Sequence, residues 1–290
     1  MLKVWIEAMR LRTLPVSLAG VIYAGALGLL TGRFALMPWV LALLFALLAQ
    51  IASNFANEYF DFRAGLDRPG REGPRRGVTE GDITPRAMLG ATLATLAVAC
   101  IIGVALVALW GEWWMYAVGV AVALGVLAYS TGPYPLSHHG WGEMAVVIFF
   151  GVVPVCLTYM LMGGPCLWWV VAAAVGIGLL GANVLMVNNY RDADDDRAVG
   201  KRTLAVKLGR VAVSNLYLAS GYLAATLTLP EWIAAAQWGW MCPCIYAVAH
   251  TSLYAMLRSR KGRALNPLLG MTAMLMLLYT LAFAAAVRFS

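Results

Sequence analysis

Long apolar segments separated by short polar stretches make up almost the whole chain. Nine such segments can be distinguished, and each is continuous rather than alternating between apolar and polar positions. A helix needs about 20 apolar residues to cross the hydrocarbon core of a bilayer, and unbroken runs favour helices over barrel strands. The predicted spans are 14–32, 36–56, 87–109, 113–131, 142–162, 166–187, 211–229, 232–256 and 267–287. The pattern therefore predicts an all-α, polytopic integral membrane protein with nine transmembrane helices.

The composition agrees with this prediction. Of the 290 residues, 62% are hydrophobic and only 12% are charged, whereas about 25% charged residues is usual for a soluble domain. The basic residues are dispersed over short loops, which argues against nucleic-acid binding. Membrane lipid is the expected partner, and no feature of the chain indicates an obligate protein partner.

The basic residues also indicate the orientation of the spans. Nineteen of the 21 Lys and Arg residues fall at the N-terminus or in alternate connections, and only Arg33 and Arg288 fall on the other side. Because positively charged loops stay in the cytoplasm, we expect a cytoplasmic N-terminus and an external C-terminus. The predicted outer connections include 111–112, 163–165 and 230–231.

Two polar stretches that follow the second and sixth spans share one spacing. Asn57 precedes Asp61 by four residues, and Asn188 precedes Asp192 by four residues. If the helix continues, both members of each pair project from one face. Carboxylates are costly near a bilayer, so a matched pair of such clusters indicates a function that needs them.

The two clusters are suited to hold a divalent cation against a diphosphate. Carboxylates repel a diphosphate, but Mg²⁺ prefers oxygen ligands and bridges carboxylates to substrate phosphates. The predicted ligands are Asp61, Asp67, Asp192 and Asp196, with amide oxygens from Asn57 and Asn188. The alternative is that acidic residues only balance the Arg residues of a solvated loop. We apply that interpretation to Asp194 and Asp195, which fit neither four-residue step.

Basic residues next to both clusters are suited to bind the diphosphate. Arg76 lies in the glycine-rich stretch 73–81, Arg191 lies within the second cluster, and Lys201 follows it in 200–203. Arginine binds phosphate oxygens through two parallel hydrogen bonds. For any single one of these residues, a role as a positive-inside anchor is an equal alternative.

A charged mouth beside an apolar interior suits the chemistry of an allylic diphosphate. Ionisation of such a substrate gives a carbocation, which an apolar cavity shields from water and an electron-rich ring can attack. Tyr134 and Glu143, in and after the third inner loop, are the predicted contacts to the aromatic acceptor. His138 and His139 lie in the same loop, where ordinary surface or packing roles are commoner than a catalytic one.

The two clusters also suggest an internal repeat. Asn57 and Asn188 are 131 residues apart, which corresponds to four spans. We therefore expect one domain over residues 1–290, built from two pseudo-repeated four-helix units, about 14–131 and 142–256, and a ninth helix, 267–287. Each unit would contribute one acidic cluster to a shared central cavity.

Taken together, these motifs resemble a known family. They are the acidic stretches 57–67 and 188–196, Gly73-Pro74-x-Arg76, Gly132-Pro133-x-Pro135 and the segment 200–204. On these motifs, and over nearly its whole length, the chain resembles the UbiA-type intramembrane aromatic prenyltransferase superfamily. It is most similar to the 1,4-dihydroxy-2-naphthoate polyprenyltransferases of menaquinone biosynthesis. Glu58 stands where the superfamily usually has Asp, and the longer spacing from Asp61 to Asp67 is similar to that of the naphthoate branch.

The resemblance implies an activity and a location. It implies magnesium and diphosphate at the six acidic and amide residues named above, with Arg76 and Lys201 on the diphosphate. A polyprenyl group would pass from polyprenyl diphosphate to 1,4-dihydroxy-2-naphthoate with loss of carbon dioxide, giving demethylmenaquinol. The enzyme would lie in the bacterial inner membrane with its active site facing the cytoplasm. The alternative within the enzyme class is another aromatic acceptor, such as 4-hydroxybenzoate or homogentisate.

Two other classes remain as alternatives. A transporter would carry ionisable residues deep in its spans, where this sequence has almost none. A non-catalytic scaffold that binds a quinone or sterol would tolerate Asp192→Ala, whereas an enzyme would not.

Overall fold

The computed structural model describes residues 2–67 and 75–289, and every regular element in these ranges is a helix. The helices are α1 (Leu2–Ala8), α2 (Leu14–Leu30), α3 (Leu36–Arg63), α4 (Pro85–Trp110), α5 (Met115–Ala128), α6 (Gly142–Val146), α7 (Val153–Leu161), α8 (Trp168–Ala198), α9 (Leu204–Ala235), α10 (Met241–Ser259) and α11 (Asn266–Phe289). Three 3-10 turns, η1 (Leu11–Thr13), η2 (Leu136–His138) and η4 (Gly262–Leu265), lie between them, and a π turn, η3 (Val147–Val152), joins α6 to α7. The prediction of an all-α fold is confirmed.

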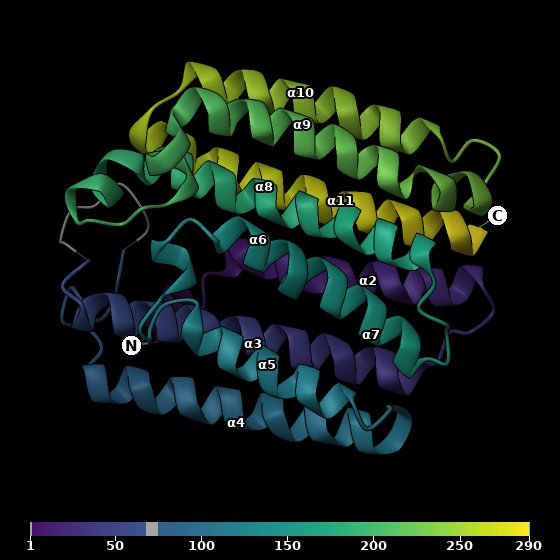
Figure 1. Cartoon of the computed structure of the whole chain (residues 1–290), viewed down its shortest axis with the longest axis horizontal. Helices are drawn as coiled ribbons and strands as arrows, with labels where there is room; N and C mark the ends of the chain where they lie inside the picture. Colours follow the sequence, from purple (N-terminus) through teal and green to yellow (C-terminus); the bar gives the residue numbers. More distant parts are fainter. Residues whose placement is uncertain (1, 68–74, 290) are drawn as a thin grey trace.

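The long helices lie side by side, with α8 in the interior (Figure 1). Helix α8 packs against α9, α11, α6 and η3, whereas α4 packs mainly against α3 at the edge of the bundle. Most of α8 is buried, whereas only four residues of α4 are buried. The C-termini of α3 and α8 and the N-termini of α6 and α11 lie at the same end of the bundle. We call this the site end, and it lies on the left in Figure 1.

Six helical segments of the described chain are long and apolar enough to cross a membrane. They are Leu2–Leu30, Leu36–Arg63, Pro85–Trp110, Gly142–Leu161, Trp168–Ala198 and Gly262–Phe289. Helix α5 is apolar but shorter, and α9 and α10 carry more polar residues. The predicted apolar segments therefore correspond to helices, while the total of nine membrane spans stays a prediction.

The turn predicted at residues 230–231 is wrong. Helix α9 continues through Pro230 to Ala235, and the chain reverses over residues 236–240 instead. Trp232 is fully buried and packs against the rings of Tyr279 and Phe283, with ring centroids 5.1 Å away in each case. This packing anchors the last turn of α9 in the core, and a proline is tolerated in such a helix when neighbouring helices surround it.

Close contact between two glycines fixes the position of α6 and α7 against α8. A Cβ atom on Gly151 of η3 would lie 2.4 Å from the Ala174 carbonyl oxygen, and one on Gly178 would lie 2.5 Å from the Val147 carbonyl oxygen. Only glycine allows the backbones to approach so closely, as is common at helix contacts in membrane proteins. The contact holds the first turn of α6 beside the polar end of α8.

Candidate active site

The first acidic cluster is built by the end of α3. The helix continues past its apolar part to Arg63, so Asn57 and Asp61 share one face as predicted, and both are buried. Gly65 then adopts the left-handed conformation that ends many helices, with φ at 68°. Asp67 therefore follows the turn rather than extending the helical face.

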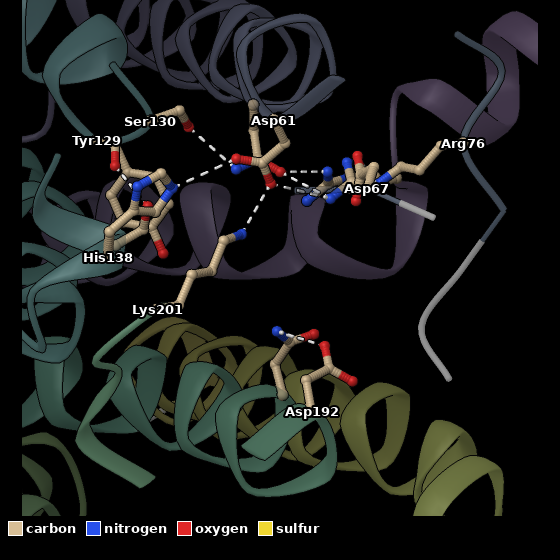
Figure 2. Close-up of polar contacts among 12 residues, drawn as sticks. Asp61, Asp67, Arg76, Tyr129, Ser130, His138, Asp192 and Lys201 are labelled. Atoms are coloured by element: carbon tan, nitrogen blue, oxygen red, sulfur yellow. Dashed lines mark hydrogen bonds and ion pairs between the residues drawn. The ribbon is translucent and has the colours of Figure 1, made fainter. Parts of the chain in front are cut away.

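Asp61 is contacted by cationic or ionisable side chains from three separate segments (Figure 2). The Lys201 Nζ atom lies 3.1 Å from Oδ2 of Asp61, and Nη2 of Arg76 lies 3.8 Å from the same oxygen. The His138 Nε2 atom lies 3.4 Å from Oδ1. These partners come from the α8–α9 connection, the α3–α4 connection and η2.

Arg76 also links the other members of the first cluster. Its Nη2 atom donates a hydrogen bond to Oδ1 of Asn57 at 3.0 Å, and its Nε atom lies 3.3 Å from Oδ2 of Asp67. The side chains of Arg76, Asp61 and Asp67 are all nearly fully buried. Gly73 and Pro74, which precede this arginine in the predicted phosphate-binding stretch, lie outside the described residues.

The second acidic cluster lies along one face of α8. Nε and Nη2 of Arg191 donate to the two carboxylate oxygens of Asp192 at 2.6 and 2.7 Å. Nη2 also donates to Oδ1 of Asn188 at 2.8 Å, and Nη1 donates to Oδ1 of Asn266 at 2.9 Å. Asp196, one turn later, accepts a hydrogen bond from the Thr203 hydroxyl at 3.3 Å. The shared face of Asn188, Asp192 and Asp196 is as predicted.

A cavity of about 620 Å³ opens between the two clusters. Its polar lining includes eight of the predicted site residues: Asn57, Asp61, Arg76, Asn188, Arg191, Asp192, Asp196 and Lys201. Its apolar lining includes Val16, Val146, Phe150, Val184, Leu185 and Leu269. The volume is typical of a small-molecule site. The predicted arrangement, opposed acidic clusters beside an apolar hollow, is therefore present.

The remaining predicted residues are not among those that line this cavity. Asp67 is buried against Arg76. Tyr134 is 52% exposed and stacks on the ring of His139, with centroids 3.7 Å apart. Glu143 is buried behind the cavity wall, where it accepts a hydrogen bond from Asn189. The structure thus does not bring Tyr134 to the cavity, and Glu143 reaches it only through a neighbour.

Some residues of the site carried no signal in the sequence. Arg10 lines the cavity and donates to Oδ1 of Asn57, and it has the one positive φ, 52°, of any non-glycine residue in 2–67 and 75–289. His138, for which the sequence favours an ordinary surface or packing role, contacts Asp61. Asn266, at the start of α11, is placed beside Arg191. A spacing rule could have found none of them, because each contact joins segments far apart in the chain.

The donor atoms fit magnesium and do not fit a metal held by protein ligands alone. Within the described residues, no three His, Cys, Asp or Glu side chains converge to form a metal site. Mg²⁺ needs no such cage, since it binds through one or two carboxylates together with substrate phosphates and water. The carboxylate and amide oxygens at the cavity suit it, and the adjacent guanidinium and ammonium groups suit a polyphosphate anion.

Comparisons with known proteins find relatives over nearly the whole chain. The sequence model of the UbiA prenyltransferase family matches residues 17–271. The 1,4-dihydroxy-2-naphthoate octaprenyltransferase of Mycobacterium tuberculosis is 37% identical and covers 98% of this chain and 97% of its own. The Escherichia coli protein of the same name is 32% identical over 99% of this chain and 95% of its own length.

Solved structures share the fold. A UbiA homolog from Aeropyrum pernix K1 superposes with a TM-score of 0.70 at 18% identity, covering 94% of this chain and 96% of that one. A UbiA homolog from Archaeoglobus fulgidus, bound to DMAPP and Mg²⁺, superposes with a TM-score of 0.66 at 16% identity, covering 99% of this chain and 100% of that one.

Proposed function

Because the chain belongs to the UbiA prenyltransferase family, we propose that it transfers a polyprenyl group from polyprenyl diphosphate to 1,4-dihydroxy-2-naphthoate. The reaction loses carbon dioxide and gives demethylmenaquinol. The observation that carries this proposal is the pair of acidic clusters facing each other across one cavity, with basic side chains beside both. The acceptor follows from the names of the relatives that match almost the full chain.

The two acidic clusters bind the metal ion, and their basic neighbours bind the diphosphate. Magnesium, when bound, would neutralise the diphosphate and make it a better leaving group. The residues that would hold it are Asn57, Asp61, Asn188, Asp192 and Asp196, which line the cavity. Asp67, the sixth predicted ligand, lies behind them and would reach the ion only after leaving Arg76. The diphosphate is held by Arg76, Arg191 and Lys201, which exchange their present carboxylate partners for phosphate oxygens. Such an exchange keeps every buried charge paired.

The apolar wall then protects the reacting carbon. The bond between the first carbon of the prenyl chain and the diphosphate oxygen breaks, and both electrons leave with the diphosphate. An electron pair of the naphthoate ring forms the new carbon–carbon bond at the carbon that bears the carboxylate. The carboxylate leaves as carbon dioxide, and the electrons of its bond restore the aromatic ring. Val146, Val184 and Leu185 keep water from the carbocation.

We propose that this chemistry takes place at the cytoplasmic surface of the bacterial inner membrane. Nine membrane helices with a cytoplasmic N-terminus put the site end, where most basic residues lie, on the cytoplasmic side. The chain then consists of two pseudo-repeated four-helix units, each of which brings one acidic cluster to the cavity, and a ninth helix that follows them. The product, which carries a long apolar tail, stays in the bilayer.

A membrane assay tests the proposal. Membranes that contain the protein are supplied with radiolabelled polyprenyl diphosphate and, in turn, 1,4-dihydroxy-2-naphthoate, 4-hydroxybenzoate or homogentisate, with magnesium or with a chelator. We expect labelled lipid only with the naphthoate and magnesium, together with release of its carboxyl carbon as carbon dioxide. Preference for another acceptor would overturn the acceptor assignment, and transfer to none would overturn the enzyme class.

A further inference from the structure

A buried carboxylate outside both acidic clusters faces the cavity wall. Glu143, in the first turn of α6, is 7% exposed, and its Oε1 atom accepts a hydrogen bond from Nδ2 of Asn189 at 2.8 Å. Its second oxygen, Oε2, is enclosed and has no hydrogen-bond partner among the described residues. A buried carboxylate is costly. Binding of the diphosphate does not explain why Glu143 is a carboxylate, because Glu143 belongs to neither acidic cluster.

Asn189 lines the cavity between its apolar wall and the second acidic cluster. It lines the cavity on α8, one turn after the apolar Leu185 and three residues before Asp192. Three residues correspond to about 4.5 Å along the helix axis. Under the proposed function the diphosphate binds at the acidic clusters and the prenyl chain lies along the apolar wall, so the acceptor ring has to reach the boundary between them, where Asn189 lies.

The contact with Glu143 determines which end of the Asn189 amide faces the cavity. A side-chain amide offers two N–H donors and one oxygen acceptor. A carboxylate oxygen takes the Nδ2 end, because the opposite orientation would set two acceptors against each other. No described residue donates a hydrogen bond to Oδ1 of Asn189. The atom that Asn189 offers to a ligand is therefore a hydrogen-bond acceptor.

Packing keeps this pair in place. The glycine contact between η3 and α8 sets the distance between α6 and α8. A Cβ atom on Gly142, the residue before Glu143, would lie 3.0 Å from Leu185 and 3.6 Å from the Tyr129 hydroxyl, both of which belong to residues that line the cavity. The first turn of α6, which carries Glu143, is thus packed closely against α8, which carries Asn189.

We infer that Oδ1 of Asn189 accepts a hydrogen bond from a ring hydroxyl of the aromatic acceptor, and that Glu143 is the positioning residue that orients it. The inference rests on the proposed function and adds to it the group that recognises the hydroxyl. A buried acceptor oxygen discriminates strongly against a ring that lacks the hydroxyl, since the oxygen would then stay unpaired. Glu143 acts through Asn189 and does not touch the substrate.

Competing ligands test this recognition directly. In the transfer assay, 1-hydroxy-2-naphthoate and 2-naphthoate are compared as inhibitors, since they differ by one hydroxyl. We expect the wild-type protein to bind the hydroxylated compound about tenfold more tightly. Asn189→Leu and Glu143→Leu should reduce this ratio to about one and leave the KM for polyprenyl diphosphate unchanged. Glu112→Gln, at an exposed position near Trp113, is the matched control and should keep the ratio.

Conservative variants separate recognition from folding. Glu143→Gln should keep the ratio, because its amide oxygen still accepts from Nδ2 of Asn189. Asn189→Asp should lose it, since two carboxylates then face each other. The double variant Asn189→Asp with Glu143→Gln should regain it, because the glutamine amide donates to one aspartate oxygen and leaves the other for the ligand.

Two results would overturn the inference, and they are distinguishable. If the wild-type protein transfers prenyl groups but Asn189→Leu, Glu143→Leu and Asn189→Asp all keep the tenfold ratio, the hydroxyl is recognised elsewhere. If the wild-type protein transfers to no hydroxylated aromatic acid, the proposed function itself fails.

Discussion

The two acidic clusters share the Asn-x-x-x-Asp step but are held in different ways. Asp61, on α3, is contacted by Arg76, His138 and Lys201, which lie 15, 77 and 140 residues further along the chain. Asp192, on α8, is paired with its immediate neighbour Arg191, which also holds Asn188. One cluster is closed by loops that converge on it, and the other is set largely within a single helix.

This difference means that the second cluster is held rigidly, whereas the first cluster can rearrange. The second cluster needs only the helical geometry of α8 to place its carboxylates and its guanidinium. The first depends on the α3–α4 and α8–α9 connections, so binding of a diphosphate can rearrange it without unwinding a helix. We expect the two clusters to contribute equally to catalysis but unequally to stability.

The largest expected effect is the loss of either central carboxylate. Asp61→Asn and Asp192→Asn should each lower kcat/KM about 1000-fold. In the proposed function both carboxylates would hold the magnesium ion that binds the diphosphate, and preorganised electrostatic groups contribute effects of this size. Initial rates with labelled polyprenyl diphosphate measure this. A tenfold or smaller loss for one of them would show that a single cluster suffices.

Breaking the local ion pair should affect stability most. Arg191 and Asp192 are 2% and 4% exposed, and Arg191→Gln leaves a buried carboxylate without its main partner. The free energy of unfolding in detergent should fall by about 3 kcal/mol. Adding Asp192→Asn should restore much of this free energy and leave activity abolished.

Arg76→Gln should lower the free energy of unfolding by less, since Asp61 keeps Lys201 and His138. Equal destabilisation by both arginine variants would contradict the comparison.

Removing Lys201, which links the α8–α9 connection to α3, should weaken the binding of polyprenyl diphosphate. Lys201→Met deletes the contact between Nζ and Asp61 at 3.1 Å. We expect the KM for polyprenyl diphosphate to rise about tenfold, the contribution of one hydrogen bond to a charged group. The KM for the naphthoate should stay the same, and steady-state kinetics with each substrate varied in turn distinguish the two. A rise in the naphthoate KM alone would show that Lys201 faces the acceptor.

The smallest effect is expected for an acidic residue that fits neither motif. Asp194 is 71% exposed and forms surface ion pairs with Arg197 and Arg210, and such pairs contribute little to stability. Asp194→Asn should change activity less than twofold in the same assay. A loss of tenfold or more would mean that Asp194 belongs to the second cluster together with Asp192 and Asp196.

Much of the fold and half of the site geometry could be predicted from local patterns. Continuous apolar runs predict helices because the backbone must satisfy its own hydrogen bonds in lipid. The faces that carry Asn57 with Asp61 and Asn188 with Asp192 follow from 3.6 residues per turn. Both are properties of a single helix, and both hold in the structure.

Local sequence patterns are enough to specify the helices and the residues on the two acidic faces. Packing between segments far apart in the chain, in contrast, brings His138 and Arg10 to the site, leaves Tyr134 at the surface and moves the turn after α9 beyond Pro230. The reason is physical. Helices that are apolar on most faces carry little information about which face meets which neighbour, so contacts between distant segments are set by close packing, such as that of Gly151 on Gly178 and Trp232 on Phe283.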